Sequence, residues 1–178
     1  MREIAWNPST TPGQNPSGDA SISSEALSTY FWWHSIRLND GRVTPGRKPL
    51  HVMDQECART FGPVDLVGKS VLDVGAWNGG FSIEAARRGA GRVVALDHAT
   101  WKNPMFRGRT VFEIAKRLCN VAIEAIDQDL DVPQLSLSHL GTFDIAVPGR
   151  LLSFARPLGG AKGDLSTGSG CSDFGNPH

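Results

Sequence analysis

The stretch Val71-Leu-Asp-Val-Gly-Ala-Trp-Asn-Gly-Gly-Phe81 decides the fold. Its pattern predicts a short buried strand over residues 70–75, a glycine-bearing turn, and a helix over residues 79–88 that ends before Gly89. Glycine has no Cβ, so a ligand can approach the backbone of the turn closely, and the turn places a helix N-terminus beside that ligand. The stretch therefore predicts a ligand site at the carboxyl end of a strand.

Similar apolar segments lie on both sides of this stretch. We expect a helix over residues 50–60, further strands over 92–97, 121–126 and 142–147, and an amphipathic helix with Val111, Ile114, Ala115 and Leu118 on one face. Strands that alternate with helices and are apolar throughout are typical of a parallel sheet covered by helices on both faces. The predicted fold class is α/β.

Composition restricts the class of protein further. The 178 residues include 18 basic and 18 acidic side chains, so the net charge is zero, which argues against a broad electrostatic binder of nucleic acid. No run of about 20 apolar residues predicts a membrane span, and the N-terminus lacks the apolar core of a signal peptide. Three isolated cysteines (Cys57, Cys119 and Cys171) fit a reducing compartment, so we expect a cytoplasmic protein. No His or Cys spacing predicts a metal site.

Three ligands use a strand, a glycine turn and a helix in this order. A nucleoside triphosphate requires a lysine in the turn, and none is present. The G-x-G-x-x-G pattern of NAD sites has Trp77 at its middle glycine. The looser pattern of S-adenosylmethionine (SAM) sites, an acid followed by alternate glycines, matches Asp73, Gly75 and Gly79, with Trp77 as a departure. Asp97 ends the next strand, 22 residues after Gly75, where a carboxylate can accept both hydroxyls of a ribose.

Residues 30–147 resemble a known family at several separate places. Besides the turn, the matching segments are 33–36, 39–41, 43–46, 66–73 and 140–145. The chain is similar to the class I SAM-dependent methyltransferases, in the branch described as tRNA (mo5U34) methyltransferase-like, where a tryptophan in the turn is expected. The resemblance implies a Rossmann-like sheet, SAM as cofactor, and methyl transfer to an RNA or small-molecule acceptor that the sequence does not identify. It also implies a set of cofactor-binding residues: Asp73, Gly75, Ala76, Trp77, Asn78, Gly79, Asp97, His98, Asp131 and Val132.

Each of these assignments competes with a simpler interpretation. Asp73 could satisfy only the backbone amides at a strand end, and Trp77 could be a core side chain. Asp129 is an alternative to Asp131 at the adenine edge, because the alignment can slide by two residues. His34 is a candidate base, but packing is the more frequent role of such a histidine, so the catalytic residues stay unknown.

The end of the chain departs from the family. Residues 147–158 can be encoded by bases that, read one position later, give FLGVFYHLRDPL, the kind of string with which the family continues; the family's Tyr-His pair is replaced by Leu152-Ser153. We therefore expect residues after about 145 to be translated out of frame and the C-terminal strands of the sheet to be missing. The expected organisation is a flexible arm over 1–29, a partial SAM-binding domain over 30–147, and a disordered tail over 148–178.

Two functions follow from these observations. The first is transfer of a methyl group from SAM to an acceptor. The alternative is an inactive, truncated remnant that at most binds SAM or acts as an interaction fragment. We also expect marginal stability, with Phe143, Ile145 and Val147 lacking a partner on one side. An NAD-dependent oxidoreductase is disfavoured by Trp77.

Overall fold

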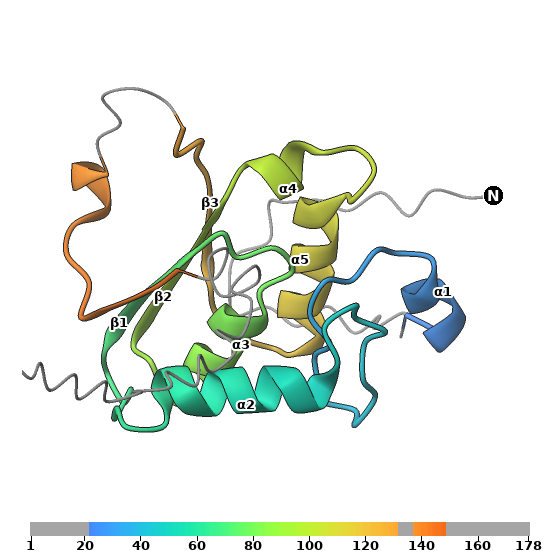
Figure 1. The fold of residues 1–178 in the computed structure, drawn as a ribbon, viewed down its shortest axis with the longest axis horizontal. Helices are drawn as coiled ribbons and strands as arrows, with labels where there is room; N and C mark the ends of the chain where they lie inside the picture. Colours follow the sequence, from blue (N-terminus) through green and yellow to red (C-terminus); the bar gives the residue numbers. More distant parts are fainter. Residues whose placement is uncertain (1–21, 132–136, 149–178) are drawn as a thin grey trace, which may run out of the picture.

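The computed structural model describes residues 22–131 and 137–148. They form five α-helices, four strands and one short 3-10 helix in the order α1 (Ser24–Ser28), α2 (Leu50–Phe61), β1 (Ser70–Val74), α3 (Gly80–Arg87), β2 (Arg92–Asp97), α4 (Ala99–Lys102), α5 (Gly108–Leu118), β3 (Glu124–Asp127), η1 (Ser138–Leu140) and β4 (Ile145–Val147) (Figure 1). Each predicted helix and strand between residues 50 and 147 is present, with ends that differ by a few residues.

The four strands form one parallel sheet in the order β3-β2-β1-β4. Leu72 of β1 lies opposite Val94 of β2 and Ala146 of β4, and β2 continues the same register into β3. The chain winds outward from β1 to β3 and then returns to the other side of β1, which makes the carboxyl ends of β1 and β4 a topological switch point. The predicted α/β fold, a Rossmann-like parallel sheet, is confirmed, but the expected helices on both faces are not found within the described residues, whose core-forming helices pack on one face. Among the described strands, β3 and β4 form the two edges.

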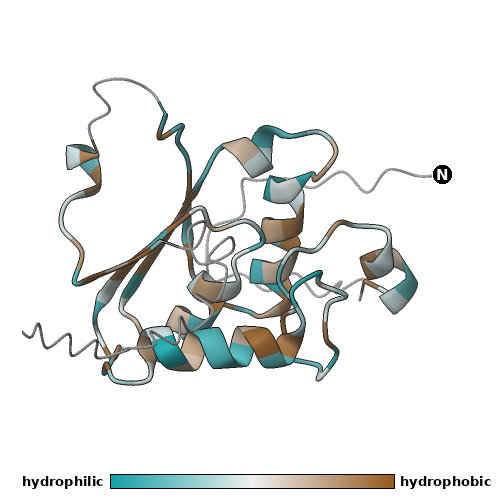
Figure 2. Ribbon diagram, viewed as in Figure 1, coloured by the Kyte–Doolittle hydropathy of each residue, from teal (hydrophilic) through white to brown (hydrophobic). Residues whose placement is uncertain are grey.

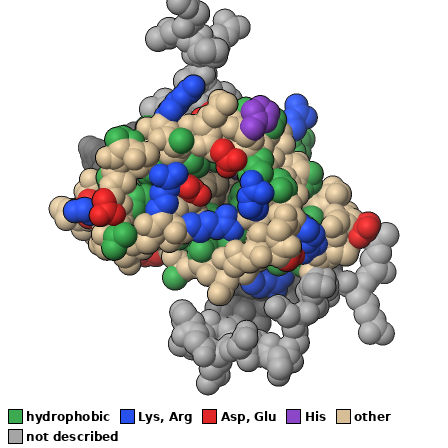
Figure 3. Space-filling model, turned by 90° about the horizontal axis from the view of Figure 1, so that it is seen from below, with side chains coloured by type: hydrophobic (Ala, Val, Ile, Leu, Met, Phe, Trp, Pro, Cys, Tyr) green, Lys and Arg blue, Asp and Glu red, His purple; other side chains and the backbone are tan. Residues whose placement is uncertain are grey.

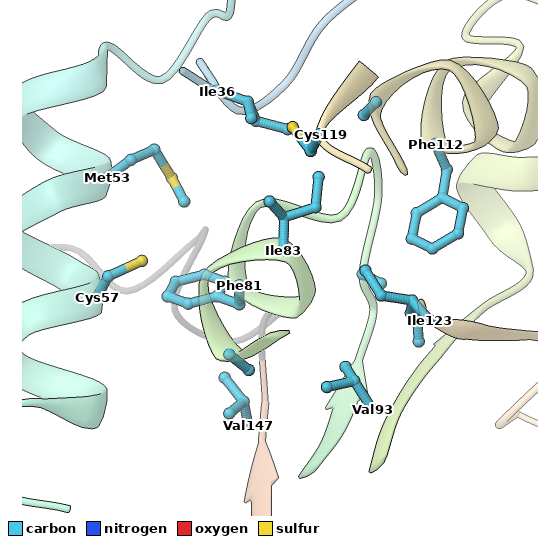
Figure 4. Close-up of a cluster of buried hydrophobic side chains, with 14 of the residues drawn as sticks. Ile36, Met53, Cys57, Phe81, Ile83, Val93, Phe112, Cys119, Ile123 and Val147 are labelled. Atoms are coloured by element: carbon cyan, nitrogen blue, oxygen red, sulfur yellow. The ribbon is translucent and has the colours of Figure 1, made fainter. Parts of the chain in front are cut away.

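The helices and the hydrophobic core lie on one face of this sheet. Apolar residues of α2, α3 and α5 form one cluster with Val71, Val93 and Val147, which share a face of the strands (Figure 4). Right-handed crossovers explain this, because β1 to β2 and β2 to β3 step in the same direction and so carry α3 and α5 to the same face. The described part of the return from β3 to β4 lies on the other side of the sheet and carries only η1 (Figure 1).

The middle of β2 is apolar on both faces even so (Figure 2). Val94 and Leu96 of β2, which alternate with the core residues, are both fully buried. On that face the described part of the return segment holds Leu140, which is buried, and its carbonyl accepts a hydrogen bond from Arg92 at 2.8 Å. A near-continuous apolar strand is what a sheet buried on two faces requires.

Two expectations need correction. The flexible arm predicted over residues 1–29 is wrong for its described end, because Ser23 caps α1 and Leu27 is buried in the core. The Nε1–H of Trp32 donates to the carbonyl of Leu27 at 2.9 Å, which fixes α1 on the domain. Val147 was expected to lack a partner, but it is fully buried in the core cluster, since α3 covers β1 and β4 on that face. The predictions about residues 1–21, 132–136 and 149–178 lie outside the described residues.

Candidate functional site

The turn between β1 and α3 is built from left-handed backbone. Gly75, Trp77 and Gly79 have φ values of +77°, +54° and +81°. Glycine adopts such angles without strain, whereas tryptophan does so rarely. Gly79 also has to be small, because a Cβ there would lie 2.8 Å from the ring of Phe112. The backbone of the turn therefore requires positive φ angles at positions 75, 77 and 79. Trp77 adopts such an angle although tryptophan disfavours it.

The amides of this turn are occupied by the protein itself. The N–H groups of Gly75 and Ala76 donate to the carbonyl of Leu96 at 2.7 and 3.1 Å, and that of Trp77 donates to Oδ2 of Asp97 at 2.9 Å. In the first turn of α3, Gly80 donates to Nδ1 of His34 and Ser82 to Oδ2 of Asp73. A phosphate cradle needs such amides to be free. The turn is therefore a poor phosphate site, which further disfavours a dinucleotide.

A cavity of about 260 Å³ lies at the carboxyl ends of β1, β2 and β3. Five of the predicted site residues line it: Gly75, Trp77, Asp97, His98 and Asp131. Its volume is close to the lower end of the roughly 300–1,000 Å³ typical of small-molecule sites. The sequence also missed several lining residues, among them Thr100, Asn103, Phe106 and Gln128. Of these, only Gln128 follows a predicted strand, and the others lie around α4, which no pattern indicated.

Asp97 connects two segments of the cavity wall. Its Oδ2 accepts from Trp77 and its Oδ1 accepts from the backbone N–H of Thr100 at 3.1 Å, so it joins the glycine turn to the start of α4. The residue is only 5% exposed. Each carboxylate oxygen can accept two hydrogen bonds, so one position on each remains for a ligand. This arrangement suits the two hydroxyls of a ribose.

His98 is held at the rim by acidic residues. Its Nδ1 lies 2.7 Å from Oδ1 of Asp127, whose other oxygen pairs with Nζ of Lys102 at 2.9 Å. Partial burial raises the pKa of Asp127, but the hydrogen bonds from Lys102 and His98 outweigh it and leave the pKa below its usual value. Asp127 therefore stays charged and fixes the imidazole ring.

Asp129 and Asp131 both remain candidates for contact with the adenine edge. Asp129 and Asp131 both line the cavity, and Oδ1 of Asp129 accepts from the backbone N–H of Asp131 at 2.9 Å. Val132 lies outside the described residues. The alternative between Asp129 and Asp131 stays open.

Four other predicted residues do not line this cavity. Ala76, Asn78 and Gly79 lie in the turn but face the protein. Asp73 is fully buried, and its Oδ2 accepts from both the backbone and the hydroxyl of Ser82, which fastens α3 to β1. Burial raises the pKa of Asp73 to about 6, although the hydrogen bonds from Ser82 act in the opposite direction. Direct contact of Asp73 with a cofactor stays a prediction, and its role in the described structure is to hold the helix.

His34, the candidate base, is packed in the interior of the protein. The side chain is fully buried beside the ring of Phe81, and burial, with a smaller effect of the charge of Lys48, lowers its pKa to about 3. Its backbone and the side-chain amide of Asn78 exchange two hydrogen bonds of 2.9 Å. His34 therefore joins the upstream segment to the turn as a neutral ring.

Trp77 belongs to an aromatic cluster beside the cavity. Its ring stacks on Trp33 with centroids 4.9 Å apart, and Phe106 and Phe31 lie 5.3 and 6.2 Å away. The Nε1–H of Trp101 donates to the carbonyl of Trp77 at 2.7 Å. Trp77 is 8% exposed and lines the cavity, so it is both a packed side chain and part of the site wall.

The charges on the face that carries α2 are of mixed sign. Lys and Arg side chains are interspersed with Asp and Glu on the face that carries α2 (Figure 3). Arg42, Lys48 and Arg109 pair with Asp40, Glu56 and Glu113. Within residues 22–131 and 137–148, no cluster of three or more His, Cys, Asp or Glu could hold a metal ion. None of the described helices is long and apolar enough to cross a membrane.

Gly75→Val is expected to weaken ligand binding beyond the strain that it introduces. At φ +77° a β-branched residue costs of order 1–3 kcal/mol, whether or not a ligand is present. Gly41 provides a matched control, since it has φ +86° and no atom within 4 Å of a Cβ. Chemical denaturation should show a loss for both variants, larger for Gly75→Val because Gly75 is buried and Gly41 exposed, whereas calorimetry should show weakened SAM binding only for the first. Equal affinity in both variants would make Gly75 a purely structural turn.

The family model of FtsJ-like methyltransferases matches residues 55–135, which span α2 to the return segment after β3. No curated protein sequence matches the chain. Among solved structures, a 16S rRNA methyltransferase from T. thermophilus in complex with AdoMet and guanosine is 22% identical to this chain, with a TM-score of 0.44. The match covers 72% of this chain and 34% of that protein. An RNA methyltransferase from Salinibacter ruber in complex with S-adenosyl-L-homocysteine is 24% identical, with a TM-score of 0.32. That match covers 46% of this chain and 49% of the other protein.

These matches are partial. The chain spans between 26% and 58% of the length of the solved structures. The family match contains the glycine turn, Asp97 and the cavity-lining residues of β3, and it covers less than half of the 178 residues. Residues 55–135, which carry this site, are thus similar to the FtsJ-like methyltransferases.

Proposed function

We propose that this protein binds S-adenosylmethionine and is a class I SAM-dependent methyltransferase of the tRNA (mo5U34) methyltransferase-like branch. The observation that carries the proposal is the cavity at the carboxyl ends of β1–β3, which is walled by the glycine turn and by Asp97. The similarity of residues 55–135 to FtsJ-like methyltransferases supports the same cofactor. The acceptor is an RNA or a small molecule.

The residues of the cavity fit this cofactor better than a nucleotide. Asp97 keeps two acceptor positions for ribose hydroxyls, and Asp129 or Asp131, which both line the cavity, would accept from an adenine amino group. Gly75 brings the backbone to the cavity wall without a side chain. A phosphate group would meet carboxylates here and a turn whose amides are occupied, which is repulsive at short range.

The chain mainly has to position its ligands. The sulfonium of bound SAM supplies an activated methyl group. Asp97 and the turn would fix the nucleoside, while the aromatic cluster excludes water from one side of the cavity. An acceptor hydroxyl also has to lose its proton, and in the described residues His34 is too deeply buried to accept it. The base is therefore a different group.

Asp97→Asn is expected to weaken SAM binding by about 10- to 150-fold. The substitution keeps the shape of the side chain but replaces one carboxylate oxygen by an NH2 group, which cannot accept, so the equivalent of one charged hydrogen bond to the ribose, about 1.5–3 kcal/mol, is lost. The same NH2 group would also face the backbone N–H of Trp77 or of Thr100. Isothermal calorimetry measures the affinity, and circular dichroism confirms the fold. Asp65→Asn, an exposed aspartate away from the cavity, serves as the control and should bind as the wild type does.

The same measurements separate the candidate functions. Binding of NAD in place of SAM would contradict the proposal. SAM binding without transfer of a labelled methyl group to RNA or to small hydroxyl compounds would favour the inactive remnant. Equal SAM affinity in wild type and Asp97→Asn would remove Asp97 from the site.

A further inference from the structure

The wall of the cavity beside the glycine turn is aromatic. Trp77 and Phe106 both line the cavity, with ring centroids 5.3 Å apart and planes inclined by 51°. Phe106 lies between α4 and α5, in a stretch that no sequence pattern singled out. Trp33, which does not line the cavity, stacks on Trp77 with an interplanar angle of 19° and supports the indole.

The charged groups of the same cavity are mostly acidic. Asp97, Asp129 and Asp131 line it, and no Lys or Arg of the described segments does so. His98 is already engaged by Asp127. Aromatic rings attract cations through the negative potential of their faces, and nearby carboxylates add to this attraction. The cavity thus combines an apolar wall with a field that favours a positively charged organic ligand.

We propose that Trp77 and Phe106 form a cation-recognition wall for the sulfonium of SAM, which makes the site selective for SAM over S-adenosylhomocysteine. This inference rests on the proposed function. The two ligands share the adenosine and the amino acid, and they differ in the methyl group and the positive charge on sulfur. A preference for SAM therefore reports on the charge at sulfur, to which both the rings and the carboxylates of the cavity respond, and the ring variants separate the two because they leave the carboxylates in place.

The test measures the affinity of both ligands by calorimetry. The wild type should bind SAM about 3- to 30-fold more tightly than S-adenosylhomocysteine, the range expected from one or two cation–π contacts. Phe106→Leu keeps an apolar side chain but removes the ring, and it should lower this ratio toward one. Trp77→Phe should retain most of the preference, whereas Trp77→Leu should lose it.

Phe31→Leu is the matched control. Phe31 belongs to the same aromatic cluster, 5.0 Å from Phe106, but it does not line the cavity. The control should therefore keep the wild-type ratio. Because Phe106 is only half-buried, its variant decides the test even if Trp77→Leu fails to fold.

The outcomes are distinguishable. A wild type that binds both ligands equally, or prefers S-adenosylhomocysteine, overturns the cation-recognition wall but leaves SAM binding intact. Equal weakening of both ligands by Phe106→Leu also overturns it, because the ring then serves only as packing. A wild type that binds neither ligand contradicts the proposed function itself.

Discussion

Trp77→Ala is expected to lower the free energy of unfolding by about 3–5 kcal/mol, the usual loss when a buried tryptophan is truncated. The indole is 8% exposed and contacts Trp33, Phe31 and Phe106, so its removal opens a void at the junction of three segments. A domain of this size has a total stability of about 5–15 kcal/mol, so the loss is a large part of it. Urea denaturation followed by circular dichroism measures it.

Trp77→Gly is the informative companion variant. Glycine is normally about 0.5–1 kcal/mol worse than alanine, because the unfolded chain gains freedom. At φ +54° the order reverses, since alanine is strained there and glycine is not. We therefore expect stability to fall in the order wild type, Trp77→Gly, Trp77→Ala. An alanine variant more stable than the glycine variant would show that the turn leaves the left-handed region when the ring is absent.

The buried side chains of His34 and Asp73 are expected to change the stability of the fold with pH in opposite directions. His34 has a pKa lowered from 6.5 to about 3, so the unfolded chain takes up its proton first and stability falls as pH drops from about 6.5 to 3. Asp73 has a pKa raised from 3.8 to about 6, so the folded chain takes up its proton first and stability falls as pH rises from about 4 to 6. In the wild type the two slopes largely cancel near pH 4.5.

Single substitutions should separate these slopes. Between pH 7 and 4.5, Asp73→Asn leaves the effect of His34 and should lose about 2–3 kcal/mol, whereas His34→Gln leaves the effect of Asp73 and should gain about 2 kcal/mol. Denaturation series at several pH values measure both, and His51→Gln, an exposed position on α2, is the control. Parallel pH profiles for the two variants would contradict the buried, neutral state of His34.

The backbone of the site follows from local sequence. The apolar runs at 70–74 and 92–97 form neighbouring strands, of which β2 is buried on both faces, and the glycines at 75 and 79 allow the positive φ angles that the turn between them requires. Asp97 is placed by the end of its own strand, next to the turn in a parallel register. Spacing along the chain determines each of these features, so the position of the cavity could be predicted.

The contacts that give the site its character were decided by tertiary structure. Trp77, whose backbone is in the left-handed region, packs against Trp33, Phe31 and Phe106. These rings come from segments about 30 to 45 residues away along the chain, on either side of Trp77. The same holds for His34 against Gly80, and for Asp127 against His98. The single helical face depends on the handedness of successive crossovers, which no residue encodes locally. The sequence alone thus determined the strands, the turn and Asp97, whereas long-range packing decided which side chains line the cavity, because a side chain's neighbours depend on how distant segments meet.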